Sequence, residues 1–179
     1  FVAGREQTNA KQAKAFWLDL DVGKANESNS YATREAALHD LDRLMKEVCL
    51  PPPLLVSSGN GLHAYWTFTQ AIDRDDWTHL TGRLRGVLRH LKIKFDPSRD
   101  CDIASILRPP GTHNRKAGSS KLVKVMLPGR DRPAEEYSEI LDIFIRANGV
   151  LVEAARSLVD NSDLGVTVEY PPSSFVAAT

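Results

Sequence analysis

With 179 residues, 42% of them hydrophobic and 26% charged, the chain is long enough for one domain with a sizeable core, or for one domain with a small appendage. It holds no apolar run near the roughly 20 residues of a membrane span and no signal-peptide pattern, so we expect no membrane partner. Cys49 and Cys101 lie far apart and outside any metal-ligand spacing, which excludes a structural zinc motif and fits a reducing cytoplasm.

The first predicted element is a strand at residues 14–22, inside the segment "KAFWLDLDVG". Its apolar residues alternate and point into a core: Phe16, Leu18, Leu20 and Val22. Asp19 and Asp21 therefore share the opposite face, where two carboxylates repel unless a cation lies between them. Hard oxygen ligands suit Mg²⁺ or Mn²⁺, so the pair indicates a divalent-metal site. The alternative is a pair of carboxylates that simply faces water at a strand end.

The next elements are two amphipathic helices that flank a pair of short strands. Residues 33–48 carry apolar residues at helical spacing, with Thr33 as the N-cap and three prolines after the end of the helix. Residues 54–68 predict two short strands joined by a glycine-rich turn. Residues 74–92 predict the second helix, with most of its basic side chains outside the apolar stripe.

The turn "SSGNGLH" places a histidine, His63, directly after two glycines and two serines. Gly59 and Gly61 would bring backbone N–H groups close to an anion, and a hydroxyl such as that of Ser58 adds a donor. A histidine in this setting can donate to a phosphate oxygen, and we expect it to do so best when protonated. A histidine that is only a satisfied core or surface residue is the alternative.

A long loop at residues 92–118 carries the next chemical signals. Arg108 and Lys116 flank a rigid Pro-Pro-Gly turn, so the pair indicates either a clamp for a triphosphate or two solvated charges on a surface loop. Asn114 would either hold this loop or touch the ligand. A third carboxylate for the metal comes from the same loop. The candidates are Asp96, Asp100 and Asp102, and we favour Asp96 because it lies at the end of an apolar approach.

Charge is distributed unevenly along the chain. Residues 83–130 carry 12 basic and 3 acidic side chains, whereas the segments on either side are acidic. Such a block indicates either a phosphate-bearing partner, whose phosphates the helix at 83–92 would then line, or a solvated helix face with a few basic loops. A strand at 121–128, helices at 134–147 and 149–160 and an extended tail complete the chain. Because strands and helices alternate without a regular βαβ rhythm, we expect an α+β fold with a largely antiparallel or mixed sheet.

Three segments in this order resemble the archaeo-eukaryotic primase (AEP) superfamily, and within it the primase-polymerases of phages and plasmids. The segments are "FWLDLDVG", "SSGNGLHAYW" and "FDPSRDCDIASILRPPGTHNRK", and the likeness covers roughly residues 14–127. The resemblance implies an RNA-recognition-motif-like catalytic sheet packed with a smaller α/β module, the cleft between them holding the site, and a C-terminal helical extension. Two departures are Gly61, where many relatives have serine, and Pro109, which follows Arg108 where leucine or valine is common.

The resemblance also implies the role of each site residue. Asp19, Asp21 and Asp96 would be the catalytic metal ligands of a two-metal site that takes Mg²⁺ or Mn²⁺. The nucleotide would be bound by His63, Ser58, Gly59, Gly61, Arg108, Asn114 and Lys116. The catalytic domain would span residues 1–130, with a truncated N-terminus, and residues 131–179 would form the helical extension and a linker tail.

The sequence therefore predicts a template-dependent nucleotidyltransferase, a DNA primase with DNA polymerase activity, in phage or plasmid replication. Its partners would be a single-stranded DNA template, NTP or dNTP substrates and a helicase domain or protein, in the cytoplasm of a bacterial or archaeal host cell. The alternative is a non-catalytic replication-initiator module that binds DNA or nucleotide. A sugar-nucleotide glycosyltransferase would also use an Asp-x-Asp pair, but it gives no reason for the Arg108 and Lys116 clamp.

Overall fold

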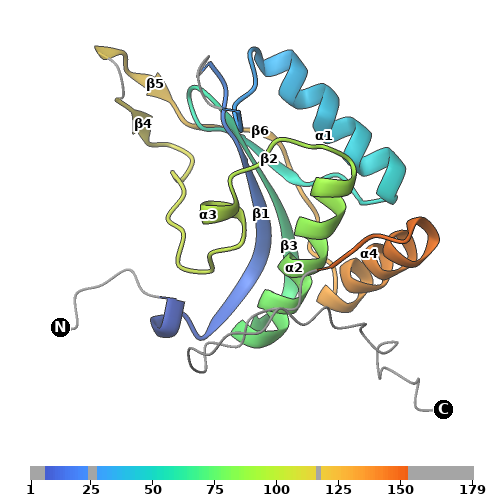
Figure 1. Ribbon diagram of the computed structural model, residues 1–179. Helices are drawn as coiled ribbons and strands as arrows, with labels where there is room; N and C mark the ends of the chain where they lie inside the picture. Colours follow the sequence, from blue (N-terminus) through green and yellow to red (C-terminus); the bar gives the residue numbers. More distant parts are fainter. Residues whose placement is uncertain (1–6, 24–27, 116–117, 153–179) are drawn as a thin grey trace, which may run out of the picture.

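The computed structural model describes residues 7–23, 28–115 and 118–152, and Figure 1 shows how their elements are arranged. The elements, in chain order, are η1 (Gln7–Asn9), β1 (Gln12–Leu20), α1 (Arg34–Val48), β2 (Leu54–Ser57), β3 (Leu62–Asp73), α2 (Arg74–His90), α3 (Pro97–Asp100), β4 (His113–Asn114), β5 (Lys121–Leu122), β6 (Lys124–Leu127) and α4 (Ala134–Asn148). Residues 149–152 are not helical. The rest of the predicted 149–160 helix and the tail lie outside the described residues.

The main sheet has four strands in the order β1-β3-β2-β6, and every neighbouring pair is antiparallel. Along the chain, β1, α1, β2, β3, α2 and β6 follow the β-α-β-β-α-β succession of split βαβ folds. In Figure 1, α1, α2 and α4 lie to one side of this sheet, whereas α3 and the small β4–β5 sheet lie to the other. The predicted α+β class with an antiparallel sheet is confirmed.

The sequence predicted the start of α1 correctly but not the end of β3. Thr33 is the N-cap of α1, and its hydroxyl accepts from the backbone N–H of Ala36 at 3.2 Å, as predicted. β3 runs to Asp73, five residues beyond the predicted strand end at residue 68, because its polar end pairs with the start of β1. That exposed extension carries little apolar alternation, so the sequence pattern did not predict it.

The core lies between the sheet and the helices, and its centre is aromatic. The Phe16 ring stacks on Trp66 with 5.0 Å between centroids and meets the edge of Tyr137, from α4, at 5.2 Å. Phe16 and Leu18 are fully buried, as the alternation in β1 predicted. The opposite face of β1 carries Asp19 and Trp17, and the Trp17 ring is buried against Trp77 of α2, with 5.2 Å between centroids.

α4 belongs to the same core as the sheet. Its residues Tyr137, Leu141 and Phe144 are buried, and the helix packs against α2 and β3. The division of the chain at residues 130 and 131 stays a prediction. Among the described residues, no helix combines the length and the apolar composition needed to cross a membrane.

We expect Phe16→Ala to lower the free energy of unfolding by about 3–5 kcal/mol, because it opens a cavity among stacked rings. Phe16→Leu retains most of the volume and should cost much less. Urea unfolding followed by circular dichroism measures both. A loss below about 1 kcal/mol for the alanine variant would show that this aromatic cluster does not centre the core.

Candidate active site

The pairing of β1 with β3 places two of the predicted site residues opposite each other. Asp19 is the register partner of His63, so their side chains share one face of the sheet. The Nε2 atom of His63 lies 3.6 Å from Oδ1 of Asp19. Both side chains are largely buried, with 2% of His63 and 11% of Asp19 exposed. Asp21 follows the end of β1 and is close enough to His63 for its charge to act on the imidazole.

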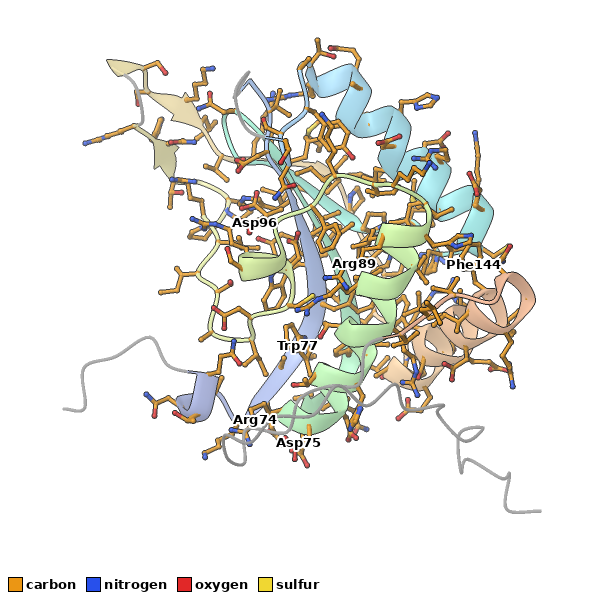
Figure 2. All side chains as sticks on the ribbon, viewed as in Figure 1. Arg74, Asp75, Trp77, Arg89, Asp96 and Phe144 are labelled. Carbon is orange, nitrogen blue, oxygen red and sulfur yellow. The ribbon has the colours of Figure 1, made fainter. Side chains whose placement is uncertain are left out.

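Asp96 joins this pair from the loop after α2. It is the N-cap of α3, which lies beside β1, and Figure 2 shows it at the start of that helix. Nε of Arg99 lies 3.6 Å from Oδ2 of Asp96 and 3.9 Å from Oδ2 of Asp19. The Arg99 guanidinium therefore occupies the space between the two carboxylates, and it offsets their repulsion.

Asp100, another candidate for the third ligand, has a different position. It is fully buried, and its two oxygens accept the backbone N–H groups of Asp19 at 2.6 Å and of Asp96 at 2.9 Å. Burial raises the pKa of Asp100 to about 8, and the nearby carboxylate of Asp19 adds to the increase while the two N–H bonds oppose it. Asp100 thus ties the backbones of two site residues together, an arrangement that favours Asp96 over Asp100 as a ligand.

The third candidate, Asp102, caps its own turn. Its Oδ1 accepts the backbone N–H of Ala104 at 3.0 Å. The assignment of Asp96 as the third ligand stays a prediction, which its position beside Arg99 and Asp19 supports.

His63 is held as a neutral imidazole. Burial, with Arg108 next in size and Arg99 smaller, lowers the pKa of His63 to about 4, although the charge of Asp21 acts in the opposite direction. Tyr65, whose pKa is raised to about 12 mainly by burial, has its hydroxyl 3.2 Å from Nδ1 of His63. The hydroxyl therefore keeps its proton, and it either donates to Nδ1 or accepts from it, according to the tautomer of the imidazole. A neutral His63 carries one ring N–H donor, and its expected contact with a phosphate stays a prediction.

The glycine turn between β2 and β3 is packed too tightly for side chains. A Cβ at Gly61 would lie 2.5 Å from the Leu20 carbonyl oxygen, so no serine fits there. Gly59 has a φ of +99° and a Cβ there would lie 2.9 Å from Cβ of Asn114. The Gly61 N–H donates to the Ser58 hydroxyl, which makes the turn self-supporting. The predicted contacts of these residues with a nucleotide stay predictions.

The Arg108 loop approaches the site from the other side. The charge of Arg108 acts on His63, which places the guanidinium near the imidazole. Asn114 is buried, and its side-chain amide donates to the Ser58 carbonyl at 2.8 Å, so it holds this loop to the glycine turn. The second half of the predicted clamp, Lys116, lies outside the described residues.

The predicted metal ions require several oxygen ligands close together. Within residues 7–23, 28–115 and 118–152, no group of three or more His, Cys, Asp or Glu side chains is arranged to hold a metal. Two carboxylates, those of Asp19 and Asp96, nevertheless converge on one positive charge, and hard oxygens of this kind suit Mg²⁺ or Mn²⁺. The residues fit a divalent ion if the Arg99 side chain, which is 40% exposed, moves aside.

Part of the basic helix α2 is used for packing. Arg83 pairs with Asp142 of α4 at 2.8 Å, and Nε of Arg85 lies 3.3 Å from Sγ of Cys101. These two side chains attach α2 to its neighbours. A path for template phosphates along this helix stays a prediction.

Tyr65 escaped the sequence analysis, and so did the structural roles of Arg99 and Asp100, although Asp100 was named there as a candidate metal ligand. Tyr65 lies two residues after His63, so the period of the strand was a signal that it shares the face of the histidine. Arg99 and Asp100 lie in a polar loop whose composition resembles that of a solvated surface. No sequence pattern marks one of its carboxyls as buried.

Comparison with known proteins identifies the fold. No family model matches the chain, and no curated protein matches it. Among solved structures, the AEP domain of the cyanophage S-2L primase-polymerase superposes with a TM-score of 0.58 at 18% sequence identity, covering 77% of this chain and 65% of that one. The primase RepB' superposes with a TM-score of 0.47 at 16% identity, covering 76% of this chain and 40% of that one.

The chain therefore has an AEP-type primase fold, as the resemblance implied. It spans about 65% of the length of the primase-polymerase domain that it matches. At 18% sequence identity the likeness shows the fold alone. The chemistry of this chain depends on its own residues.

We expect Asp100→Ala to lower the free energy of unfolding by about 2–5 kcal/mol, because it leaves two buried backbone N–H groups without their acceptor. Denaturant unfolding measures this loss. The matched control is Asp42→Ala on α1, whose carboxylate is half exposed and pairs with Lys46 on the helix surface. The control should cost about 0.5 kcal/mol or less. Equal losses in both variants would contradict the structural role of Asp100.

His63 should make the stability depend on pH. Because its pKa is about 4 in the folded protein and near 6.5 when unfolded, the unfolded state binds the proton more readily between these values. The stability contribution of neutral His63 is therefore complete above pH 6.5 and is lost as the pH falls toward 4, by up to about 3 kcal/mol. His63→Gln should lack this loss. Unfolding curves of both proteins from pH 4 to 8 give the difference, and parallel pH profiles would refute the buried neutral state.

Proposed function

We propose that the protein is a template-dependent nucleotidyltransferase: a DNA primase that also extends primers as a DNA polymerase, in phage or plasmid replication. The observation that carries this proposal is that Asp19, His63 and Asp96 lie on the face of an AEP-type sheet that α3 partly covers. The structural neighbour is the AEP domain of a primase-polymerase, which supports the same reaction class.

The reaction is attack of a primer 3′-hydroxyl on the α-phosphate of a bound nucleotide, with pyrophosphate as the leaving group. The neutral His63 donates its Nε2–H to a phosphate oxygen, and Arg108, with Lys116, offsets charge on the triphosphate. Asp19, Asp21 and Asp96 would hold Mg²⁺ or Mn²⁺. When bound, such ions lower the pKa of the attacking hydroxyl and stabilise the charge on the leaving group.

Each group has a defined task before any chemistry occurs. Tyr65, in contact with Nδ1, would keep the His63 proton on Nε2. Asp100 fixes the backbone of Asp19 relative to that of Asp96. Such preorganisation is what electrostatic catalysis requires, because groups that are already oriented lose no energy in reorganising during the reaction.

The proposed partners follow from this reaction. They are a single-stranded DNA template, NTPs or dNTPs, and a helicase domain or protein, in the cytoplasm of a bacterial or archaeal host. The basic segment 83–130 supplies charge suited to template phosphates.

One observation favours a second candidate, a replication-initiator module that binds DNA or nucleotide without catalysis. Arg99 lies between Asp19 and Asp96 and pairs with both acids, an arrangement that offsets their charge in a module that only binds. Such a module would bind DNA without Mg²⁺ or Mn²⁺ and would tolerate loss of the aspartates.

Primer synthesis on a single-stranded template distinguishes the two candidates. The assay uses labelled NTPs or dNTPs with Mg²⁺ or Mn²⁺. We expect Asp19→Asn to lower the rate at least about a hundredfold, because it removes one charge of the metal-binding set. The double variant Asp19→Ala with Asp21→Ala should abolish synthesis. Chelation with EDTA should also abolish it.

The control variant is Asp42→Asn, a surface carboxylate on α1 that is half exposed. It should synthesise primers at the wild-type rate. Full synthesis by the double variant, with its fold confirmed by circular dichroism, would refute the proposed site. Metal-independent DNA binding without any synthesis by the wild type would favour the initiator module.

A further inference from the structure

A cavity of about 360 Å³ lies on the face of the sheet that carries the candidate site. Its floor is formed by Trp17, Leu54 and Tyr65, and its wall by Leu107, Pro109 and Pro110. This volume falls within the range of small-molecule sites in proteins, which are mostly apolar with a few placed polar groups. The proposed function uses no part of this cavity except Tyr65.

The strand register places the cavity directly beside the candidate active site. Trp17 and Leu54 are both register partners of Tyr65, and they form one row across three strands. The next row contains Asp19 and His63. Two residues along a strand span about 6.6 Å, so the aromatic row and the acidic row are adjacent. The Tyr65 hydroxyl, 3.2 Å from Nδ1 of His63, connects them.

The wall of the cavity carries the charge that an anionic ligand needs. Arg108 lies between two residues of the wall, Leu107 and Pro109, and its charge acts on His63. A ligand with a flat apolar end in the cavity and an anionic end at His63 would therefore meet complementary chemistry along its length.

One polar atom in the cavity lacks a partner. Ser105 lines the cavity, and its buried hydroxyl makes no hydrogen bond to any of the residues that the structure describes. A buried hydroxyl without a partner is unfavourable in the free protein. A ligand with a donor or acceptor on the rim of a flat ring would satisfy it.

We propose that this cavity binds the nucleobase of the nucleotide whose triphosphate lies at His63 and Arg108. The inference rests on the proposed function, because it takes that site as the place of the phosphates. A nucleobase combines a flat face for stacking on aromatic side chains with polar atoms on its rim, which suits the row of Trp17 and Tyr65 and the Ser105 hydroxyl. Stacking is tolerant of base identity, so the pocket holds any of the bases.

The test measures binding of dATP and of inorganic tripolyphosphate, each with MgCl₂ and without DNA, by isothermal titration calorimetry. Thr67→Trp fills the cavity from the end away from His63, because Thr67 lies two residues beyond Tyr65 on β3. We expect this variant to bind dATP about tenfold more weakly or worse, since it loses base stacking. Its affinity for tripolyphosphate should stay within about twofold of wild type, because His63 and Arg108 are unchanged.

The matched control is Thr69→Trp, the same substitution two residues farther along β3. Thr69 is exposed and does not line the cavity, so both affinities should match those of wild type. Unchanged dATP binding by Thr67→Trp would overturn the proposal. Equal losses for dATP and tripolyphosphate would also overturn it. Weaker binding of oligo(dT) without weaker binding of dATP would place a template base in the cavity instead, and would overturn it too.

Ser105→Ala gives a second test that does not depend on a bulky substitution. Removing a buried hydroxyl that lacks a partner should leave the thermal stability of the free protein unchanged or higher, yet weaken dATP binding about three- to tenfold. A merely structural residue would not produce this pair of results. Unchanged dATP affinity in Ser105→Ala would contradict its contact with the base.

The outcome is separable from that of the primer-synthesis assay. Base-dependent binding that falls in Thr67→Trp supports the pocket even if the wild type synthesises no primers. If the wild type synthesises primers and Thr67→Trp binds dATP as tightly as the wild type does, the proposed function is supported and the nucleobase pocket is refuted.

Discussion

The antiparallel pairing of β1 with β3 is the constraint on which the rest of the structure depends. Its register places Asp19 opposite His63 and Trp17 opposite Tyr65, so the acidic row and the aromatic row form on one face. On the other face, the same strands supply Phe16 and Trp66 to the core. A slip of one residue would exchange the two faces, bury the carboxylate in the aromatic core and expose the rings. Core stability and site geometry are therefore fixed by the same pairing.

The site concentrates negative charge, and a basic side chain lies among its carboxylates. Arg99 lies between Asp19 and Asp96, while Asp100 uses both of its oxygens on backbone N–H groups. The raised pKa of Asp100 and the lowered pKa of His63 both arise first from burial. Strongly shifted pKa values of this kind cluster at functional sites, because catalytic acids and bases need pKa values matched to their reaction. With 40% of its side chain exposed, Arg99 is more accessible to solvent than either Asp19 or Asp96.

The sequence was informative where a local pattern carries the physics. Alternation in "FWLDLDVG" predicted which side of β1 faces the core, and Thr33 predicted the start of α1. The resemblance to AEP proteins predicted a fold that the comparison with a solved primase-polymerase domain confirms. Local patterns could not predict that Asp100 is buried, because its partners on Asp19 are 81 residues away in the chain.

Two other features also depend on residues that lie far apart in the sequence. The role of Gly61 depends on the Leu20 carbonyl, which reaches it only through the sheet. The cavity beside the site forms from three strands and one loop that are far apart in sequence. Such features depend on tertiary contacts, whose partners no short segment encodes.

A crystal structure with Mn²⁺ and a non-hydrolysable dATP analogue tests the central claim most directly. The account predicts an anomalous scattering peak between the carboxylates of Asp19 and Asp96, with the Arg99 side chain displaced from that position. It predicts the triphosphate at His63 and Arg108, and the adenine against Trp17 and Tyr65. An Arg99 side chain that stays between the two carboxylates, with the manganese and the nucleotide bound elsewhere, would contradict the account.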